Sequence, residues 1–115
     1  MSGFLNVNFS FWNMNRRYIN LTFEQSLQQR IKRLEKKGVT FTHTQIEDIR
    51  LKLQAGYCSV CHKPKTSSQL CIDHNHRKKS YRGVLCHRCN YILGTVHDNQ
   101  ELLANLAEYL KLYLE

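Results

Sequence analysis

Two Cys-x-x-Cys pairs constrain the fold of this chain more than any other feature. The pairs are Cys58-Ser-Val-Cys61 and Cys86-His-Arg-Cys89, and 24 residues separate them. Each pair offers two thiolates within reach of one tetrahedral ion, and zinc suits four cysteines better than any other common ion. The sequence therefore predicts a structural Zn²⁺ site at Cys58, Cys61, Cys86 and Cys89. Because 24 residues exceed the usual spacing of a zinc ribbon, a folded insert must lie between the two pairs.

That insert carries acid and histidine side chains. Its first half ends in Cys71-Ile-Asp73-His74-Asn75-His76, and its second half, Tyr81-Arg82-Gly-Val-Leu, leads directly into the second cysteine pair. We predict a β-hairpin between Gln69 and Cys86, with a first strand that ends at Asp73, a basic turn, and a second strand over Tyr81–Leu85. A short helix is expected from about Arg88.

The order of these motifs resembles the recombination endonuclease VII family, a group of phage nucleases within the His-Asn-His (HNH) enzymes. The similarity covers about two thirds of the chain, from near Gly38 through the lead-in Gln54–Cys58 to the segment Glu101–Leu110. It implies a small α+β zinc-stabilised domain with a ββα-metal (HNH or His-Me finger) core and flanking helices. We expect residues 38–115 to form this nuclease domain, and residues 1–37 to form an N-terminal arm and a basic amphipathic helix.

The resemblance implies a metal-dependent DNA endonuclease whose products carry 5′-phosphate and 3′-hydroxyl ends. His74 matches the general base of the family, and Asp73 and Asn90 match the residues that hold the catalytic Mg²⁺ or Mn²⁺. The residue types suit these roles, because a neutral imidazole with a pKa near ~6.5 can accept a proton from water, and carboxylate and amide oxygens suit Mg²⁺. His76 belongs to the active site by the same resemblance, which leaves its role open among phosphate binding, assistance to the metal and orientation of a neighbour. Asn90 directly follows Cys89, so zinc binding would also fix its position.

Basic residues are concentrated around the same motifs. The net charge is +8, and residues 55–90 carry seven basic side chains and one acidic one. A DNA phosphate backbone would lie along such a surface, although a basic surface can also serve solubility alone. We assign DNA contact to the basic residues closest to the acid and histidine cluster, which are Arg77, Lys78, Lys79, Arg82 and Arg88.

Helical patterns flank the motif region. A capping box begins at Thr22, and apolar residues then recur at helical spacing until Gly38, which predicts an amphipathic helix. A second helix is expected from Thr42 or Thr44 to Gly56, because glycine suits a left-handed C-cap.

A final helix after Asp98 presents a broad apolar face, made by Leu102, Leu103, Leu106, Tyr109, Leu110 and Tyr113. We expect this face to lie in the core, with an oligomer interface as the alternative. At the other end of the chain, Leu5–Phe11 alternates apolar and polar residues, which favours a half-buried strand or an extended arm. Since this segment and the apolar stripe of the Thr22–Lys37 helix could pair two protomers, we also expect a homodimer.

The remaining cysteine and histidines are assigned no chemistry. Cys71 shares a strand face with Asp73, so it is either an inert buried thiol or a neighbour of the active site, and we expect it to be inert. The other histidines are expected to be ordinary surface or core residues, namely His43, His62, His87 and His97.

The cysteine count and the N-terminal sequence indicate an intracellular protein with reduced thiols. Five cysteines are an odd number, and Met1–Asn15 does not contain the apolar run of an export signal. No segment reaches the roughly 20 apolar residues of a membrane helix. We expect a location in the cytoplasm of a host cell or on its nucleoid, and no membrane partner.

Two functions from different classes fit these features. The first is an endonuclease that acts on DNA, either a structure-selective enzyme that cuts branched or junction DNA or a plainer homing or nicking enzyme. The second is a non-catalytic zinc-stapled module that binds nucleic acid. Such a module would need the cysteines and lysines but has no use for Asp73, His74 and Asn90 together, so their joint presence favours the enzyme.

Overall fold

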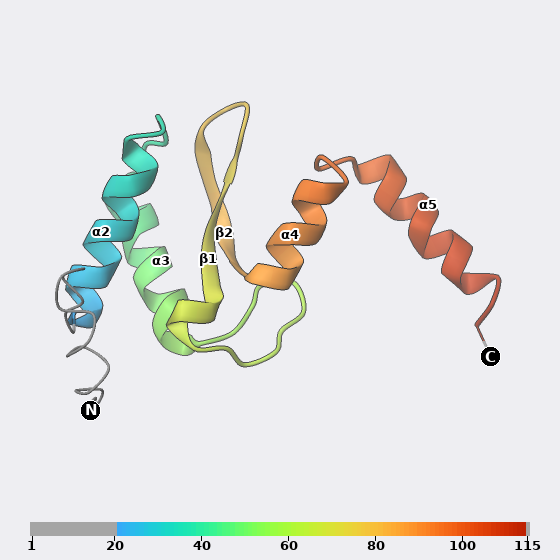
Figure 1. Ribbon diagram of the computed structural model, residues 1–115, viewed down its shortest axis with the longest axis horizontal. Helices are drawn as coiled ribbons and strands as arrows, with labels where there is room; N and C mark the ends of the chain where they lie inside the picture. The colour runs from blue at the N-terminus through green and yellow to red at the C-terminus, as the bar shows by residue number, and fades with distance from the viewer. Residues whose placement is uncertain (1–20, 115) are drawn as a thin grey trace, which may run out of the picture. The chain divides into compact units, whose positions relative to one another are not determined.

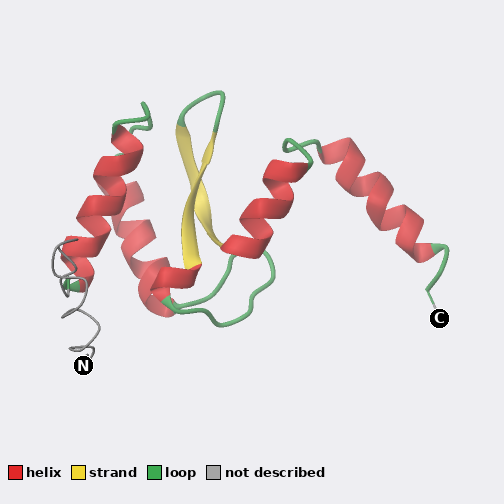
Figure 2. Ribbon diagram, viewed as in Figure 1, coloured by secondary structure: helices red, strands yellow, loops and turns green. Residues whose placement is uncertain are grey.

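The computed structural model describes residues 21–114. The described chain contains four α-helices, one short 3₁₀ helix and a two-stranded antiparallel sheet (Figures 1 and 2). It divides between Lys37 and Gly38 into two compact units. The predicted α+β class is therefore confirmed, while the predicted strand Leu5–Phe11 lies outside the described residues.

The first unit is represented by helix α2, Phe23–Glu35. Its predicted capping box is present, because Gln25 N–H donates to Thr22 Oγ1 (3.1 Å) and Thr22 N–H donates to Gln25 Oε1 (3.0 Å). Leu27 and Ile31, one turn apart, are buried. The helix ends a few residues before the predicted stop at Gly38, which takes a left-handed φ of 96°.

Helix α3, His43–Ala55, opens the second unit in the predicted place. A second capping box joins Thr42 and Gln45, with donor–acceptor distances of 3.1 and 2.9 Å. The helix ends at Gly56, which has a left-handed φ of 76°. A Cβ atom at this position would lie only 3.0 Å from the carbonyl oxygen of Lys65, so glycine is favoured here.

The predicted hairpin is formed by β1, Leu70–Asn75, and β2, Ser80–Cys86, and the 3₁₀ helix η2, Ser67–Gln69, leads into it. Strand β1 continues two residues past the predicted end at Asp73. The reason is the turn, in which Asn75 Oδ1 accepts hydrogen bonds from the N–H groups of Arg77 (2.9 Å) and Lys78 (2.8 Å). The chain therefore reverses after Asn75, which places His74 within the strand.

The core of the second unit lies around this hairpin. Helix α3 contacts β2, and helix α4, His87–Thr95, contacts both strands, as Figure 1 shows. The buried apolar side chains come from the hairpin, from α3 and from the segment before α3, namely Val39, Ile49, Leu53, Leu70, Ile72, Val84 and Leu85. A core of about this size leaves a small domain in need of further stabilisation.

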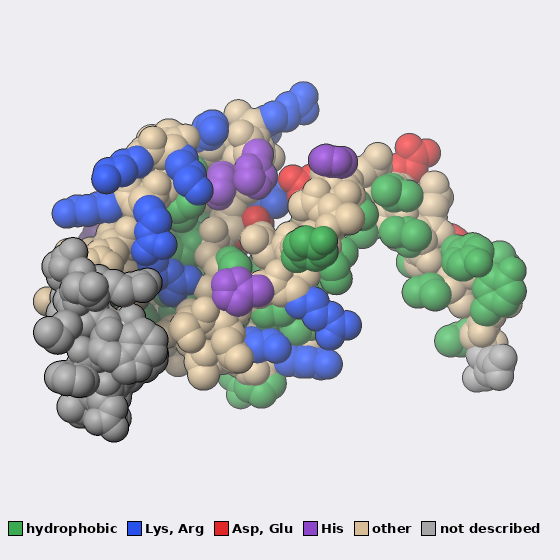
Figure 3. Space-filling model, viewed as in Figure 1, with side chains coloured by type: hydrophobic (Ala, Val, Ile, Leu, Met, Phe, Trp, Pro, Cys, Tyr) green, Lys and Arg blue, Asp and Glu red, His purple; other side chains and the backbone are tan. Residues whose placement is uncertain are grey.

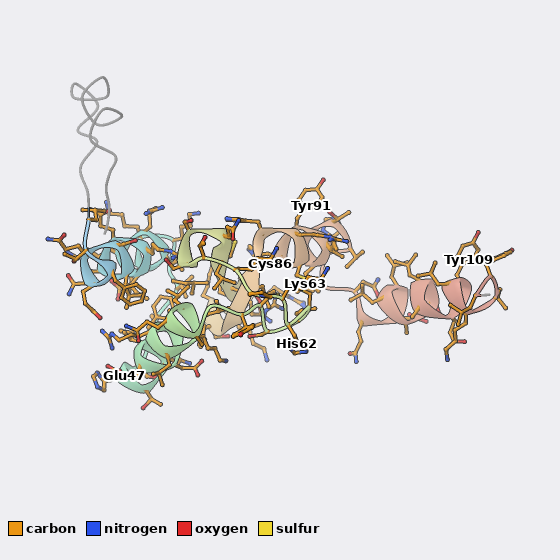
Figure 4. The ribbon with its side chains drawn as sticks, turned by 90° about the horizontal axis from the view of Figure 1, so that it is seen from below. Glu47, His62, Lys63, Cys86, Tyr91 and Tyr109 are labelled. Atoms are coloured by element: carbon orange, nitrogen blue, oxygen red, sulfur yellow. The ribbon has the colours of Figure 1, made fainter. Side chains whose placement is uncertain are left out.

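Helix α5, Gln100–Lys111, departs from the prediction. It starts where expected, with Asn99 Oδ1 accepting from Leu102 N–H (2.9 Å). Its apolar face, however, stays exposed, since Leu106 is 48% and Tyr109 59% accessible within the described chain (Figures 3 and 4). The expectation that this face joins the core was wrong, because in the part of the chain described here α5 buries no residue.

Candidate active site

The four predicted zinc ligands converge on one point. The Sγ atoms of Cys58, Cys61, Cys86 and Cys89 all lie within 4.8 Å of one another, and those of Cys61 and Cys86 are 3.9 Å apart. Sulfurs at the corners of a zinc tetrahedron are roughly 3.8 Å apart for Zn–S bonds of about 2.3 Å. The cluster therefore fits a zinc ion in both donor type and spacing.

The backbone around the cluster favours thiolates. N–H groups of Val60 (3.3 Å) and Cys61 (3.4 Å) donate to Cys58 Sγ, and the N–H of Cys89 donates to Cys86 Sγ (3.5 Å). Burial opposes ionisation of Cys58, but such N–H groups outweigh it and lower its pKa to about 6. Burial and the neighbouring thiols raise the pKa of Cys89 to about 12. Zinc binding would therefore displace protons, above all from Cys89.

The cluster also joins the hairpin to α4. The N–H of Ser59 donates to the carbonyl oxygen of Val84 in β2 (3.0 Å), and Cys86 is both the last residue of β2 and the N-cap of α4. Figure 4 shows Cys86 beside the loop that bears His62 and Lys63. Helix α4 starts one residue before the predicted Arg88 and carries Asn90 in its first turn. An ion bound to the four cysteines would thus hold Asn90 relative to β1 and β2.

Asp73 is the buried acid of the hairpin, with 6% of its surface exposed. It accepts two hydrogen bonds from Arg82, one from Nε to Oδ2 (2.7 Å) and one from Nη2 to Oδ1 (3.2 Å). Both bonds favour the charged guanidinium, so Asp73 raises the pKa of Arg82. Arg82, predicted to contact DNA, is therefore engaged with the predicted metal ligand.

A β-bulge in β2 allows Arg82 to reach Asp73. Asp73 pairs with Gly83 but His74 pairs with Tyr81, so Arg82 is an extra residue on β2 without a cross-strand partner. In a regular ladder Arg82 would lie opposite His74, on the other face of the hairpin from Asp73. The bulge turns Arg82 toward Asp73, and sequence alternation alone does not reveal it.

His74 and His76 lie close together near the end of β1, with ring centroids 4.5 Å apart. His76 also lines a cavity of about 640 Å³, bounded by Asn75, His76, Arg77, Gly94, His97 and Asp98. The cavity therefore lies between the hairpin turn and the segment that joins α4 to α5. His97, expected to be an ordinary histidine, and Asp98 were not predicted as site residues.

Asp98 is linked to the same arginine as Asp73. Arg82 Nη1 lies 3.3 Å from Asp98 Oδ2, and Arg82 Nη2 lies 3.4 Å from Asp98 Oδ1. Both His97 (φ 53°) and Asp98 (φ 55°) adopt left-handed backbone conformations. Two such residues in succession are uncommon without glycine and cluster at functional sites.

Cys71 contacts a histidine that was assigned no role. Its Sγ lies 2.9 Å from His87 Nδ1, and His87 Nε2 lies 3.1 Å from the carbonyl oxygen of Ser68. The pair connects the start of β1 to the start of α4. Whether the thiol is inert, as expected, stays a prediction.

The other predicted DNA-binding residues are exposed. Arg77, Lys78 and Lys79 occupy the hairpin turn, and Arg88 lies on α4. Figure 3 shows Lys and Arg side chains at the hairpin turn and mainly apolar ones along α5. The basic surface thus lies next to the cavity and the acid and histidine cluster.

Together, the four-cysteine cluster and the hairpin with its acid and histidines define a small metal-binding α+β domain. The family model of recombination endonuclease VII matches residues 29–112, and the chain belongs to this family. This membership confirms the resemblance seen in the motifs.

Two curated phage proteins are similar to part of the chain. The Gene 59 protein of Mycobacterium phage D29 is 37% identical over 62 residues, which are 52% of this chain and 38% of that protein. The Gene 59 protein of Mycobacterium phage L5 is 36% identical over 61 residues, or 51% of this chain and 37% of that protein. The chain thus spans less than two fifths of the length of these relatives. No solved structure matches the chain. Among the described residues, no helix is long and apolar enough to cross a membrane.

Proposed function

We propose that this chain is a metal-dependent DNA endonuclease of the HNH type that hydrolyses phosphodiester bonds and leaves 5′-phosphate and 3′-hydroxyl ends. The observation that carries the proposal is the position of Asp73 and His74. They are consecutive residues of β1, in a hairpin whose second strand runs directly into the four-cysteine cluster and α4. This order of two strands and a helix is the one expected of a ββα-metal core.

Asp73 and Asn90 are the residues that would hold the catalytic Mg²⁺ or Mn²⁺. Both offer the oxygen donors that these ions prefer, and Asp73 is buried where water competes least. When bound, the ion supplies positive charge to the reacting phosphate and leaving oxygen. The carboxylate of Asp73 is bound by Arg82.

His74 is assigned the role of general base. It lies one residue beyond Asp73 and is partly accessible, so a water next to the reacting phosphate could reach its ring. His76, close to His74 and facing the cavity, belongs to the same site without an assigned step. A zinc ion at the four cysteines would be structural, because four sulfur ligands leave no position open for water or substrate.

DNA would lie along the basic hairpin turn and α4. Arg77, Lys78, Lys79 and Arg88 can contact phosphates without reading sequence, which suits an enzyme that cuts many sequences. Residues 38–115 would form the nuclease domain, and residues 1–37 an added arm and helix. A homodimer and selectivity for branched DNA remain predictions.

A substrate panel tests this proposal. Purified zinc-loaded protein is incubated with linear duplex, single strand, nicked duplex and a four-way junction, each with Mg²⁺, Mn²⁺ or a chelator of these ions. Cleavage of at least one substrate that needs the added ion, with ends that accept ligation directly, is the expected result. If the protein binds these DNAs and cuts none of them, the non-catalytic binding module is the better account.

A further inference from the structure

Arg82 binds the carboxylate of Asp73, which the proposed function assigns to a divalent ion. Its Nε and Nη2 each donate to a different oxygen of Asp73, at 2.7 and 3.2 Å. Asp73 is buried, so its two oxygens have little access to other partners. The guanidinium and a divalent cation carry like charges, and they compete for the same two oxygens of this carboxylate. Displacement of Arg82 would free Asp73 to bind the ion.

The structure provides a second carboxylate for the displaced arginine. The Nη1 and Nη2 edge of Arg82 already faces Asp98, at 3.3 and 3.4 Å. A guanidinium that stays on Asp98 keeps its other edge free, and that edge matches the paired oxygens of a phosphate. Arg82 would then remain next to the site and turn its free edge toward DNA.

The position of Asp98 is set by its own turn. The N–H groups of His97 and Asp98 donate to the carbonyl oxygens of Gly94 (3.1 Å) and Leu93 (3.0 Å), which keeps both residues in the left-handed region. The same turn lines the cavity opposite His76 and Arg77. The segment after α4 is thus a second wall of the candidate active site.

We infer that Asp98 is a positioning residue, which holds Arg82 when a divalent ion displaces it from Asp73 and directs it to a DNA phosphate. The inference rests on the proposed function, since it requires Asp73 to bind the ion. Without ion and DNA, Arg82 lies on Asp73. With both bound, Arg82 lies between Asp98 and the phosphate, so ion and DNA each favour the binding of the other.

Mn²⁺ binding to the zinc-loaded full chain tests this without relying on activity. Electron paramagnetic resonance measures free Mn²⁺ for the original protein, Arg82→Gln, Asp98→Asn and the double variant, all without DNA. Arg82→Gln should bind Mn²⁺ about tenfold more tightly, and Asp98→Asn about threefold more weakly, within the range for contacting charged residues. In the Arg82→Gln background, Asp98→Asn should lose its effect, because Asp98 acts through Arg82. Asparagine tolerates the left-handed conformation, so the turn should persist.

Two control variants distinguish a wrong metal site from a wrong role for Arg82 and Asp98. Arg77→Gln removes the charge of an arginine that lines the cavity, while Arg82 stays on Asp73. It should change Mn²⁺ affinity less than about twofold, as screened charges do. Asp73→Asn should abolish Mn²⁺ binding in every background. If it does not, the proposed metal site is wrong. If Asp73→Asn abolishes binding but Arg82→Gln does not tighten it, the inference alone is overturned. The same holds if Asp98→Asn weakens Mn²⁺ binding equally with and without Arg82.

Mn²⁺ titration in the presence of DNA tests whether ion and DNA favour each other's binding. In the His74→Ala background, intended to bind DNA without cutting it, a duplex should tighten Mn²⁺ binding about tenfold or more, as coupling free energies commonly allow. The same duplex should have a much smaller effect when Arg82 is also replaced by glutamine. Equal tightening with and without Arg82 would contradict the inference.

Discussion

The two proposed metal sites of this domain differ in the contacts that their ligands already make. In the cysteine cluster, the sulfurs of Cys58 and Cys86 accept hydrogen bonds from backbone N–H groups. At the hairpin, Asp73 instead holds the guanidinium of Arg82. On the proposed function, the cluster is arranged to bind its ion directly, whereas binding of an ion at the hairpin would require Arg82 to move away from Asp73.

The largest expected effect is on the cluster. Cys86→Ser should lose zinc and most of the folded structure, because Cys86 is at once a proposed zinc ligand, the end of β2 and the N-cap of α4. Metal analysis and thermal unfolding measure this. A Cys86→Ser protein with one zinc ion per chain and an unchanged melting curve would show that the four-cysteine assignment is wrong.

The second expected effect distinguishes the proposed catalytic site from the cysteine cluster. Asn90→Ala should keep zinc and the fold, since its neighbours Cys86 and Cys89 are unchanged, but should weaken Mn²⁺ binding by more than about tenfold and reduce cleavage accordingly. Zinc content, Mn²⁺ titration and plasmid cleavage are measured on one preparation. Undiminished Mn²⁺ affinity would show that Asn90 is not a ligand of the catalytic ion.

A smaller effect concerns DNA. Lys78→Gln in the exposed hairpin turn should weaken duplex binding similarly for all sequences and reduce the salt dependence of log K by about one, as loss of one phosphate contact does. Lys111→Gln on α5 is the matched control, because that lysine pairs with Glu108 away from the hairpin. Equal losses in the two variants would mean that binding follows net charge and not a defined surface.

The smallest effect is on acid stability. The Tyr81 hydroxyl donates to Asp48 (2.6 Å) and lowers the pKa of Asp48 below its usual value. A depressed pKa stabilises the fold above the unfolded value of about 3.9, and this contribution is lost as pH falls through the folded pKa. Asp48→Asn should therefore flatten the acid side of the stability curve, by less than about 1 kcal/mol for a pair that is only partly buried. Denaturant unfolding between pH 3 and pH 7 compares the two proteins, and parallel curves would contradict the linkage.

Features that follow local rules were predictable from the sequence. The capping box at Thr22 and the left-handed C-cap at Gly56 each depend on residues within a few positions of one another, and the hairpin joins two strands that are adjacent in sequence. The cysteine cluster was predictable for a different reason, since metal chemistry restricts which residues can meet. These elements needed no knowledge of how distant segments pack.

Features that depend on register and packing were not predictable. The bulge that turns Arg82 toward Asp73 is set by how β1 and β2 pair, and alternation alone places the two side chains on opposite faces. The left-handed turn at His97 and Asp98 lacks the glycine that would reveal it. The apolar face of α5 has the periodicity of a core helix, but periodicity does not tell whether another element covers it.

Cleavage by His74→Ala tests the central claim most directly. DNA affinity, zinc content and the rate of Mg²⁺-dependent cleavage are measured for this variant and for the original protein at neutral pH. The account predicts unchanged zinc, nearly unchanged DNA affinity and a loss of rate of about a hundredfold or more, because a general base contributes at least that much. A His74→Ala protein that binds and cuts DNA as fast as the original would show that another residue activates the water, and that the hairpin is not the active site proposed here.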